Sequence, residues 1–233
     1  MLDFIVRDWS AWAPGLSCAD DRLIDSANLC VPKRVPKLLA RRLSPLAKAV
    51  FNVAEPCLQD GKELPVVFSS AHGEICKSLV MLQTIQAGQE LSPTAFSLSV
   101  HNAIAGLFSI AFNNSQEITV IAPCQEGIAP AFVEALGLLH EGEEEVLLIF
   151  YDEPIADFYP IAPFRLTNPD PCVLGLRIAL TGDGLALNLE RSTQSRDDGE
   201  HPVQLPEFIR FLLGDKPSMS LGNPGHSWTW HTR

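Results

Sequence analysis

Two short segments that are apolar at almost every position constrain the fold of this chain most strongly. Residues 117–122 read EITVIA and residues 145–151 read EVLLIFY, and a helical apolar pattern over 127–139 lies between them. A strand without polar alternation is buried on both faces, which requires a sheet covered by helices on each side. The sequence therefore predicts an α/β fold.

The same kinds of pattern predict further elements around these segments. Ser44 and Pro45 are residue types that favour the cap and the first position of a helix, and apolar residues follow at helical spacing as far as Cys57. Strands are also expected at residues 4–6 and 64–69, and helices at residues 74–87 and 205–213. Strands and helices thus alternate along most of the chain.

The last third of the chain has a different pattern. Apolar residues alternate over 174–180 and again over 185–189, and the turn sequence TGDG lies between them, which predicts a β-hairpin. We expect residues 1–192 to form one domain. Residues 193–233 are expected to complete that domain with a polar loop, a closing helix and a tryptophan-containing tail that is otherwise mobile.

Charge is unevenly distributed. The chain has 17 basic and 28 acidic residues and a net charge of −11, so general binding to nucleic acid is not expected. Residues 31–50 nevertheless contain six basic residues and no acidic one. Two interpretations fit this cluster: a solvated helix face, or a landing patch for an acidic partner.

The cysteines and the N-terminal residues indicate a cytoplasmic protein. The six cysteines are scattered without a CxxC pair, which favours reduced thiols over a disulfide framework. Asp3, Arg7 and Asp8 interrupt the first segment, so it does not have the pattern of a signal peptide. No run of 18 apolar residues occurs, and no membrane-spanning helix is expected.

Motifs for common chemistries are missing from the sequence. It contains no Walker loop, GxGxxG, GxSxG or HExxH, and its six histidines lack the spacing of a structural metal site. We expect neither a cofactor nor a metal. The segment SAHGE at residues 70–74 follows a predicted strand, where it either caps the next helix or carries functional groups.

One thiol lies in a position that suits a nucleophile. Cys124 follows a buried strand and precedes a helix, whose dipole favours the thiolate. His101 and Asn102 lie beside a helix rich in small residues, where they either orient a substrate carbonyl or satisfy backbone groups. One hypothesis is therefore a thiol-dependent acyltransferase that uses Cys124 assisted by His101, although no oxyanion site is evident.

Residues 67–153, with SSAHGE, LSPTAFSLSVHNAIAGLFSIA and LLIFYDEP, resemble the N-terminal half of β-ketoacyl synthases. The match looks closest to the short, chain length factor-type proteins of aryl polyene pathways, and WTW at 228–230 is similar to their tail. The resemblance implies a thiolase-like half-fold with a mixed five-stranded sheet covered by helices. The second half, which bears the catalytic histidines and lysine, is not expected, so condensation by this chain alone is not expected either.

The resemblance also assigns the position of the nucleophile. In the family's spacing from Ala135 and Gly142, that position falls on Gln125, where chain length factors of type II polyketide systems carry glutamine. A shift of one residue would place Cys124 there instead. The favoured interpretation is a subunit without a catalytic nucleophile.

The function implied by the resemblance is that of a non-catalytic, chain length factor-like subunit. It would form a heterodimer with a full-length β-ketoacyl-[acyl carrier protein] synthase, stabilise it and bound its acyl tunnel during aryl polyene elongation. The residues expected at the partner interface or the tunnel come from one strand and one helix: Thr119, Val120 and Ile121, and Ile104, Leu107 and Phe108. Ordinary core packing is the alternative for each of the last three.

A third hypothesis is an interaction module that docks the acidic acyl carrier protein. Arg41 and Arg42 are the candidate docking residues, because acidic carriers favour basic surfaces. The partner synthase is the alternative source of that docking surface.

Overall fold

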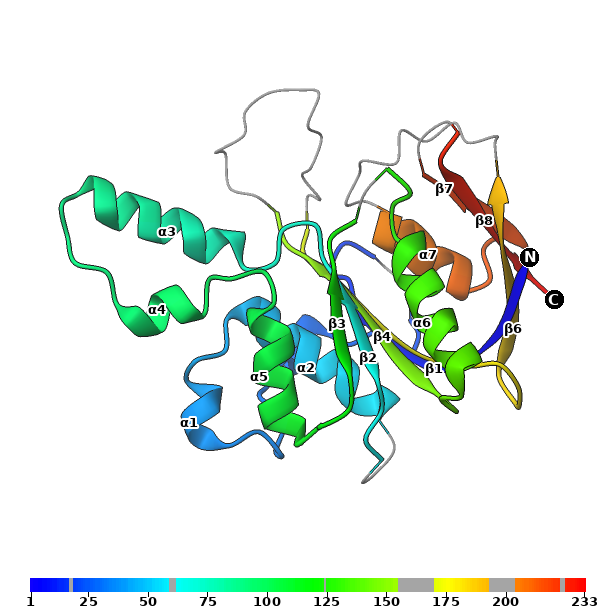
Figure 1. The fold of residues 1–233 in the computed structure, drawn as a ribbon, viewed down its shortest axis with the longest axis horizontal. Coiled ribbons are helices and arrows are strands. Elements are labelled where there is room, and N and C mark those ends of the chain that lie inside the picture. Colours follow the sequence, from blue (N-terminus) through cyan, green and yellow to red (C-terminus); the bar gives the residue numbers. More distant parts are fainter. Residues whose placement is uncertain (17–18, 59–61, 124, 155–169, 193–203, 223–224) are drawn as a thin grey trace.

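The structure is a computed structural model that describes residues 1–16, 19–58, 62–123, 125–154, 170–192, 204–222 and 225–233. In these ranges a single sheet runs through the molecule, and helices pack on both of its faces (Figure 1). The α/β fold is therefore as the apolar segments predicted. No helix in the described ranges has the length and apolarity needed to cross a membrane.

The sheet has eight strands in the order β3-β2-β4-β5-β1-β6-β8-β7. β2 pairs in parallel with β3 and β4, and the other neighbours are antiparallel, so the sheet is mixed as expected. The strands are β1 (Leu2–Trp12), β2 (Val66–Ser69), β3 (Ile118–Ile121), β4 (Val146–Asp152), β5 (Cys172–Ala179), β6 (Leu185–Ser192), β7 (Ser218–Leu221) and β8 (Ser227–Thr232).

The expected number of five strands was wrong, because β6, β8 and β7 extend the sheet beyond β1. β8 pairs with β6 and β7 with β8, so the tryptophan-containing tail forms two strands and was wrongly predicted to be mobile. The short sequences SMSL and SWTWHT alternate polar and apolar residues, a strand signal that the prediction of a mobile tail did not use.

Helices cover the two faces of the sheet in pairs. α2 (Pro45–Cys57) and α5 (Ala103–Phe112) pack on one face, and α6 (Ala129–Glu141) and α7 (Gln204–Leu212) pack on the other (Figure 1). As the sequence predicted, Ser44 caps α2: its side chain accepts a hydrogen bond from the backbone nitrogen of Ala47, 2.9 Å away. The remaining helices are α1 (Lys37–Ala40), α3 (Ile75–Gln86), α4 (Pro93–Ser97) and the 3₁₀ helix Ser26–Asn28.

Aromatic side chains fill the core on each face. On the α6 and α7 side, the ring of Phe132 lies 5.4 Å from Phe150, 5.3 Å from Phe208 and 5.6 Å from Trp230, measured between centroids. On the α2 and α5 side, Phe108 packs against Phe51 and Phe68. All seven residues of β4 are buried between these two cores, which accounts for its uninterrupted apolar sequence.

The hairpin expected from residues 174–189 does not form. β5 and β6 are not neighbours, because β1 lies between them and pairs with both. The connection between β5 and β6 crosses the edge of β1 closely: a Cβ atom on Gly184 would lie 2.3 Å from the carbonyl oxygen of Val6. The positive φ of Gly184, 140°, and its lack of a side chain permit this crossing.

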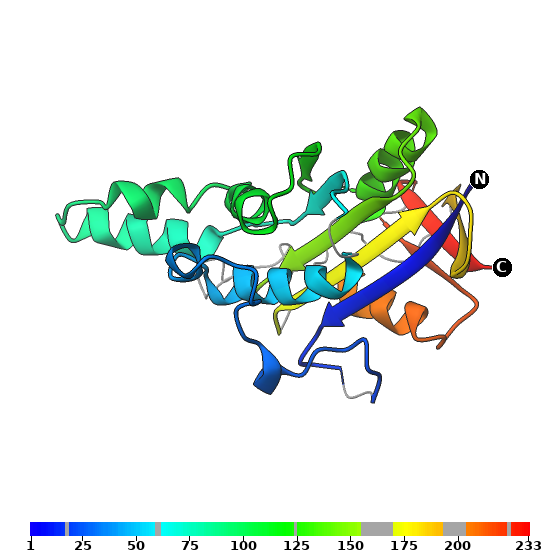
Figure 2. The ribbon, with the colours of Figure 1, turned by 90° about the horizontal axis from the view of Figure 1, so that it is seen from below.

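One part of the chain stands away from the sheet. Residues 75–100, here called the arm, contain α3 and α4 and project from one end of the molecule in both views (Figures 1 and 2). No residue of α3 or α4 is buried. The arm therefore has its own surface on almost every side, which is unusual for helices with this many apolar residues.

Candidate functional site

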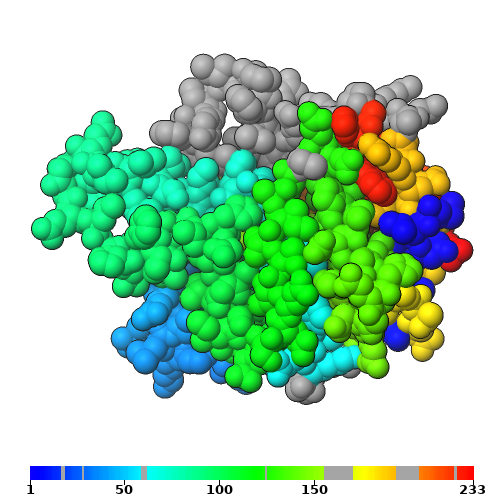
Figure 3. Space-filling model, in the orientation of Figure 1, coloured from blue at the N-terminus to red at the C-terminus, as the bar shows by residue number. Residues whose placement is uncertain are grey.

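Exposed apolar side chains gather on one part of the molecule. Of the ten large apolar residues that are exposed in the described ranges, eight lie on the arm, α5 or α6. Figure 3 shows α5, β3 and α6 as a continuous surface from which the arm extends. Apolar side chains clustered in this way mark an interaction surface. These eight are Val80, Leu82, Ile85, Leu91, Phe96, Val100, Ile110 and Val133.

An open sheet edge runs through the same surface. β3 is the first strand in the sheet and pairs only with β2 among the described strands, so one side of its backbone has no strand beside it. Its four side chains are half-buried: Ile118 and Val120 pack toward the α5 side, and Ile121 packs toward the α6 side. Thr119 donates a hydrogen bond to Glu134 of α6 at 3.4 Å. An open edge of this kind accepts a strand from another chain.

Helix α5 beside this edge has an inner and an outer face. Ile104 and Phe108 are fully inaccessible and Leu107 is buried, all within the core under α5. The outer face carries Gly106 and Ile110, and Ile110 is 66% exposed. Contact between α5 and another chain would therefore be made by Gly106 and Ile110.

Hydrogen bonds to one carboxylate fix the start of the arm. Asp152, at the end of β4, accepts hydrogen bonds at Oδ1 from the Ser70 hydroxyl (3.0 Å), the Ala71 nitrogen (2.9 Å) and the His72 nitrogen (3.3 Å). Burial raises the pKa of Asp152 to about 7, although these three donors favour the ionised form. The carboxylate thus ties the segment that enters the arm to the centre of the sheet.

The two ends of the arm are also tied to each other. The His101 Nε2 atom lies 2.7 Å from the Ser70 carbonyl oxygen, and the Tyr151 hydroxyl donates to the His101 carbonyl at 3.4 Å. A Cβ atom on Gly73 would lie 3.0 Å from the same His101 carbonyl oxygen, so a glycine is needed at this close approach. His101 thus satisfies backbone groups at the base of the arm. The SAHGE segment was expected either to cap the next helix or to carry functional groups, and the first expectation was wrong, because the N-cap residue of α3, Glu74, makes no side-chain cap hydrogen bond. The segment instead holds this base together.

The position assigned to the nucleophile lies in the connection from β3 to α6. Gln125 is exposed there, and Cys124 lies outside the described residues. The pairing of Cys124 with His101 therefore stays a prediction. Arg41 and Arg42 are both exposed and follow α1, on a part of the surface that contains neither β3 nor the arm.

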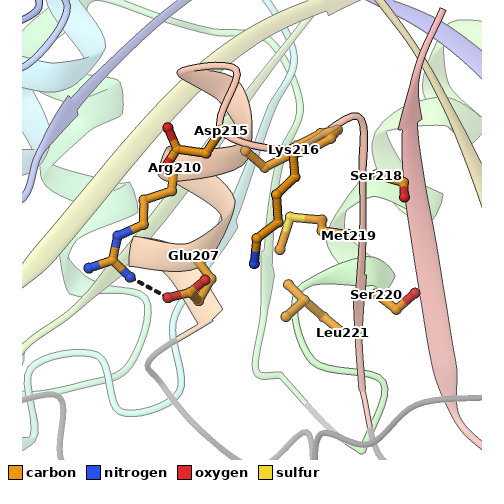
Figure 4. Close-up of a pocket in the computed structure, with 9 residues that line it drawn as sticks. Glu207, Arg210, Asp215, Lys216, Ser218, Met219, Ser220 and Leu221 are labelled. Atoms are coloured by element: carbon orange, nitrogen blue, oxygen red, sulfur yellow. Dashed lines mark hydrogen bonds and ion pairs between the residues drawn. The ribbon is translucent and has the colours of Figure 1, made fainter.

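A cavity of about 390 Å³ lies between α7 and β7, at the end of the sheet opposite β3. Figure 4 shows Lys216, Met219 and Leu221 directed into the space between α7 and β7, and an ion pair between Arg210 and Glu207 beside it. The nine described lining residues include no cysteine and no histidine. They therefore offer no thiol or imidazole group for acyl transfer.

The comparisons with known proteins account for this architecture. The family model described as the N-terminal domain of β-ketoacyl synthases matches residues 9–231. The chain belongs to this family. A search of curated proteins found no match to the sequence.

Solved structures show the same fold. The chain is similar to one in "Ketosynthase (ApeO) in Complex with its Chain Length Factor (ApeC) from Xenorhabdus doucetiae", with 26% identity, a TM-score of 0.77, and coverage of 99% of this chain and 100% of that one. The ishigamide ketosynthase/chain length factor matches at 13% identity and TM-score 0.53, covering 82% of this chain and 67% of that one. A β-ketoacyl synthase from Burkholderia phymatum STM815 matches at 9% identity and TM-score 0.52, covering 72% of this chain and 52% of that one. The thiolase-like fold and the resemblance to chain length factor-type proteins are thus confirmed.

Sequence reasoning missed the arm and the outer face of α5 as parts of the surface. The apolar spacing of residues 74–87 predicted a helix but not its surroundings, and α3 buries no residue. A signal was present, because Val80 and Ile85 add apolar residues outside the helix face that Ile75, Leu79 and Leu82 share.

Proposed function

We propose that this family member is a non-catalytic, chain length factor-like subunit that pairs with a full-length β-ketoacyl-[acyl carrier protein] synthase. The observation that carries the proposal is the coincidence of an open strand edge, β3, with most of the exposed large apolar side chains. The match over the full length of a chain from a ketosynthase–chain length factor complex supports the same conclusion.

The pairing would extend the sheet across the interface. A strand from the synthase would take up the free backbone groups of β3, with Ile110 of α5 on one side and Val133 of α6 on the other. The arm would lie along the partner and remove Val80, Ile85 and Phe96 from water. Burial of this apolar surface is the source of the expected stabilisation of both subunits.

The proposed role in elongation depends on where the subunit lies against the synthase, and not on a reaction that the subunit catalyses. With Gln125 in place of a nucleophile, the subunit would not form the acyl-enzyme. It would instead bound the acyl tunnel of the synthase, in fatty acid-like or polyketide-like elongation of the aryl polyene type. Because Ile104, Leu107 and Phe108 are buried in the chain's own core, they would act by shaping α5, and Gly106 and Ile110 would face the partner.

Co-expression with the ketosynthase encoded beside this gene tests the proposal. We expect the two chains to elute together in size-exclusion chromatography with the mass of one copy of each. A chain that elutes as a monomer in the presence of the ketosynthase would overturn the proposal. In the active complex, Gln125→Ala with unchanged product length would argue against a direct role of that side chain.

The alternative function, a thiol-dependent acyltransferase, rests on Cys124 at the start of the connection to α6. Its proposed assistant His101 already contacts the Ser70 carbonyl through Nε2, which disfavours a role as a free base. Mass spectrometry after incubation with an acyl-[acyl carrier protein] thioester separates the two functions. A stable adduct that disappears in Cys124→Ala would favour the acyltransferase, and no adduct would favour the subunit.

A further inference from the structure

Strand β7 forms the end of the sheet opposite β3, and no described strand lies on its outer side. It pairs with β8 in an antiparallel ladder, in which the backbone groups of successive residues point alternately toward the partner and away from it. The Thr232 nitrogen donates to the Pro217 carbonyl at 3.0 Å, so Pro217 points toward β8. The N–H and C=O groups of Ser218 and Ser220 therefore point away from β8, toward the open side.

The cavity of about 390 Å³ lies beside this strand. Its lining includes all four residues of β7, although Figure 4 shows Ser218 and Ser220 on the side of the strand away from α7. The cavity thus reaches the backbone of β7 and not only the side chains of one face. The opposite wall is α7, with Phe211 and the ion pair between Arg210 and Glu207. A groove between a strand edge and a helix, here called the β7 groove, suits an extended peptide.

The side chains of the β7 groove offer apolar contacts and one unpaired cation. Met219 is half-buried and Leu221 is buried, and both point toward α7 (Figure 4). Lys216 points into the same space and forms no ion pair with a described residue. Asp215 is exposed, and its carboxyl group is turned away from the Lys216 ammonium group. Apolar side chains together with one carboxylate would therefore complement this groove.

We infer that the β7 groove binds an extended segment of another protein as an antiparallel strand, with alternate apolar side chains and a carboxylate beside Lys216. The outward backbone groups of Ser218 and Ser220 would pair with the segment, and its apolar side chains would contact Met219 and Leu221. The net charge of −11 on each copy opposes a second copy of this chain as the occupant. Because β3 lies at the other end of the sheet, this site is separate from the proposed pairing with a ketosynthase.

Fluorescence polarisation with a labelled peptide tests the inference on the full chain. The probe is Thr-Val-Thr-Val-Thr-Glu-Thr, which in antiparallel register places its valines beside Leu221 and Met219 and its glutamate beside Lys216. We expect a dissociation constant of about 100 μM or lower. Proline in place of the second threonine should weaken binding about ten-fold, because it has no N–H to donate to the Ser220 carbonyl. Lysine in place of the glutamate should weaken binding about five-fold.

Two variants of the chain separate backbone pairing from charge. Ser220→Pro removes an outward amide and leaves the ladder to β8 intact, so it should weaken binding about ten-fold. Its control, Ser220→Ala, loses the hydroxyl contact with Thr229 but keeps the amide, and it should bind like wild type. Lys216→Glu should reverse the preference for the glutamate peptide over the lysine peptide. Lys37→Glu, which makes the same charge change on the exposed surface of α1, should leave that preference unchanged.

Three outcomes would overturn the inference: no binding at about 1 mM probe, equal affinity of the proline-containing peptide, or an unchanged preference in Lys216→Glu. Self-association of the chain that Ser220→Pro abolishes, without peptide binding, would overturn it in favour of a second copy. The chain should bind the probe equally well alone and in complex with the ketosynthase. Failure of the heterodimer would therefore leave peptide binding intact, and failure of peptide binding would leave the heterodimer intact.

Discussion

The Oδ1 atom of Asp152 lies 2.9 Å from the backbone nitrogen of Ala71, so the last residue of β4 holds the first residues of the segment leading into the arm. The same oxygen accepts hydrogen bonds from the Ser70 hydroxyl and the His72 nitrogen. One buried acceptor therefore satisfies three donors where the chain leaves the sheet. This group therefore holds the segment through which the chain enters the arm.

Asp152→Asn should make stability less sensitive to pH. Burial raises the pKa of Asp152 to about 7 from a usual value near 3.8, so between these values the folded chain holds a proton that the unfolded chain has released. The free energy of unfolding then falls as pH rises through this window. Asparagine keeps the Oδ1 acceptor and does not titrate. Between pH 4.5 and 8, wild type should lose about 3 kcal/mol relative to the variant in urea unfolding.

Wild type and Asp152→Asn share the other titratable groups at this site, so the contributions of those groups to the pH dependence cancel when the two stability profiles are compared. His72 acts in the opposite direction, because burial and the nearby His101 lower its pKa, which makes the folded state less stable at acidic pH. Burial also raises the pKa of Glu153. Parallel stability profiles for wild type and Asp152→Asn would contradict the assignment to Asp152.

Glu145→Gln should destabilise the fold by about 3 kcal/mol, because it leaves a buried guanidinium without its closest partner. Arg177 Nη1 donates to Glu145 Oε1 at 2.9 Å, and both residues are buried. Its other anionic neighbour, Asp8, is 3.7 Å away. Urea unfolding at pH 7 measures the loss.

A double-mutant cycle controls this prediction. Arg177→Met removes the cation, so the pair Glu145→Gln with Arg177→Met should cost less than the sum of the two single changes. Additive losses would show that the two side chains are not coupled. Burial opposes ionisation of Glu145, but Lys62, Arg177 and Arg7 outweigh it and lower the pKa, so the pair's contribution should be lost as pH falls below about 4.5.

Trp230→Ala should cost about 4 kcal/mol, the loss expected when a large aromatic side chain leaves a cavity. Trp230 is fully buried, and its ring lies 5.4 Å from Phe208 and 5.6 Å from Phe132. Trp228, two residues away on β8, is only partly buried, so Trp228→Ala is the matched control and should cost clearly less. Equal and small losses would mean that β8 does not complete the core.

Ile110→Lys should weaken the heterodimer at least ten-fold without unfolding the chain. Ile110 is 66% exposed near the C-terminal end of α5, where a lysine suits the helix dipole but would place an ammonium in the apolar interface. Leu38→Lys, at a residue that is 78% exposed and outside the proposed interface, is the control. Affinity for the ketosynthase is measured by surface plasmon resonance. Equal affinities of both variants would show that α5 is not part of the interface.

Local signals predicted the elements whose sequences carry their own caps and periodicity. α2 begins at Ser44 and Pro45 as expected, and β4 is buried along its length as EVLLIFY indicated. The strands that depend on distant partners were the ones missed. β8 pairs with β6 and β7 pairs with β8, although their short polar–apolar alternation was a local signal of strands. β1 lies between the two segments predicted to form a hairpin, an arrangement that no local pattern shows.

The candidate site was likewise predicted only in part from the sequence. The edge residues Thr119, Val120 and Ile121 were identified from the resemblance, and the structure places their strand at the end of the sheet. Ile104, Leu107 and Phe108 are apolar in a helix that is apolar all round, so the sequence could not show which face is covered by the chain itself. The arm was missed because helical spacing reports a shared face and not what covers it.

Hydrogen–deuterium exchange on β3 tests the central claim most directly. The amides of Ile118–Ile121 that point away from β2 have no strand beside them in the described structure, and they should exchange rapidly in the isolated chain. In the complex with the ketosynthase, the account predicts that these amides become protected at least ten-fold and that the arm is protected with them. Unchanged exchange on β3 in a complex shown to be intact would contradict the claim that this strand is the pairing edge.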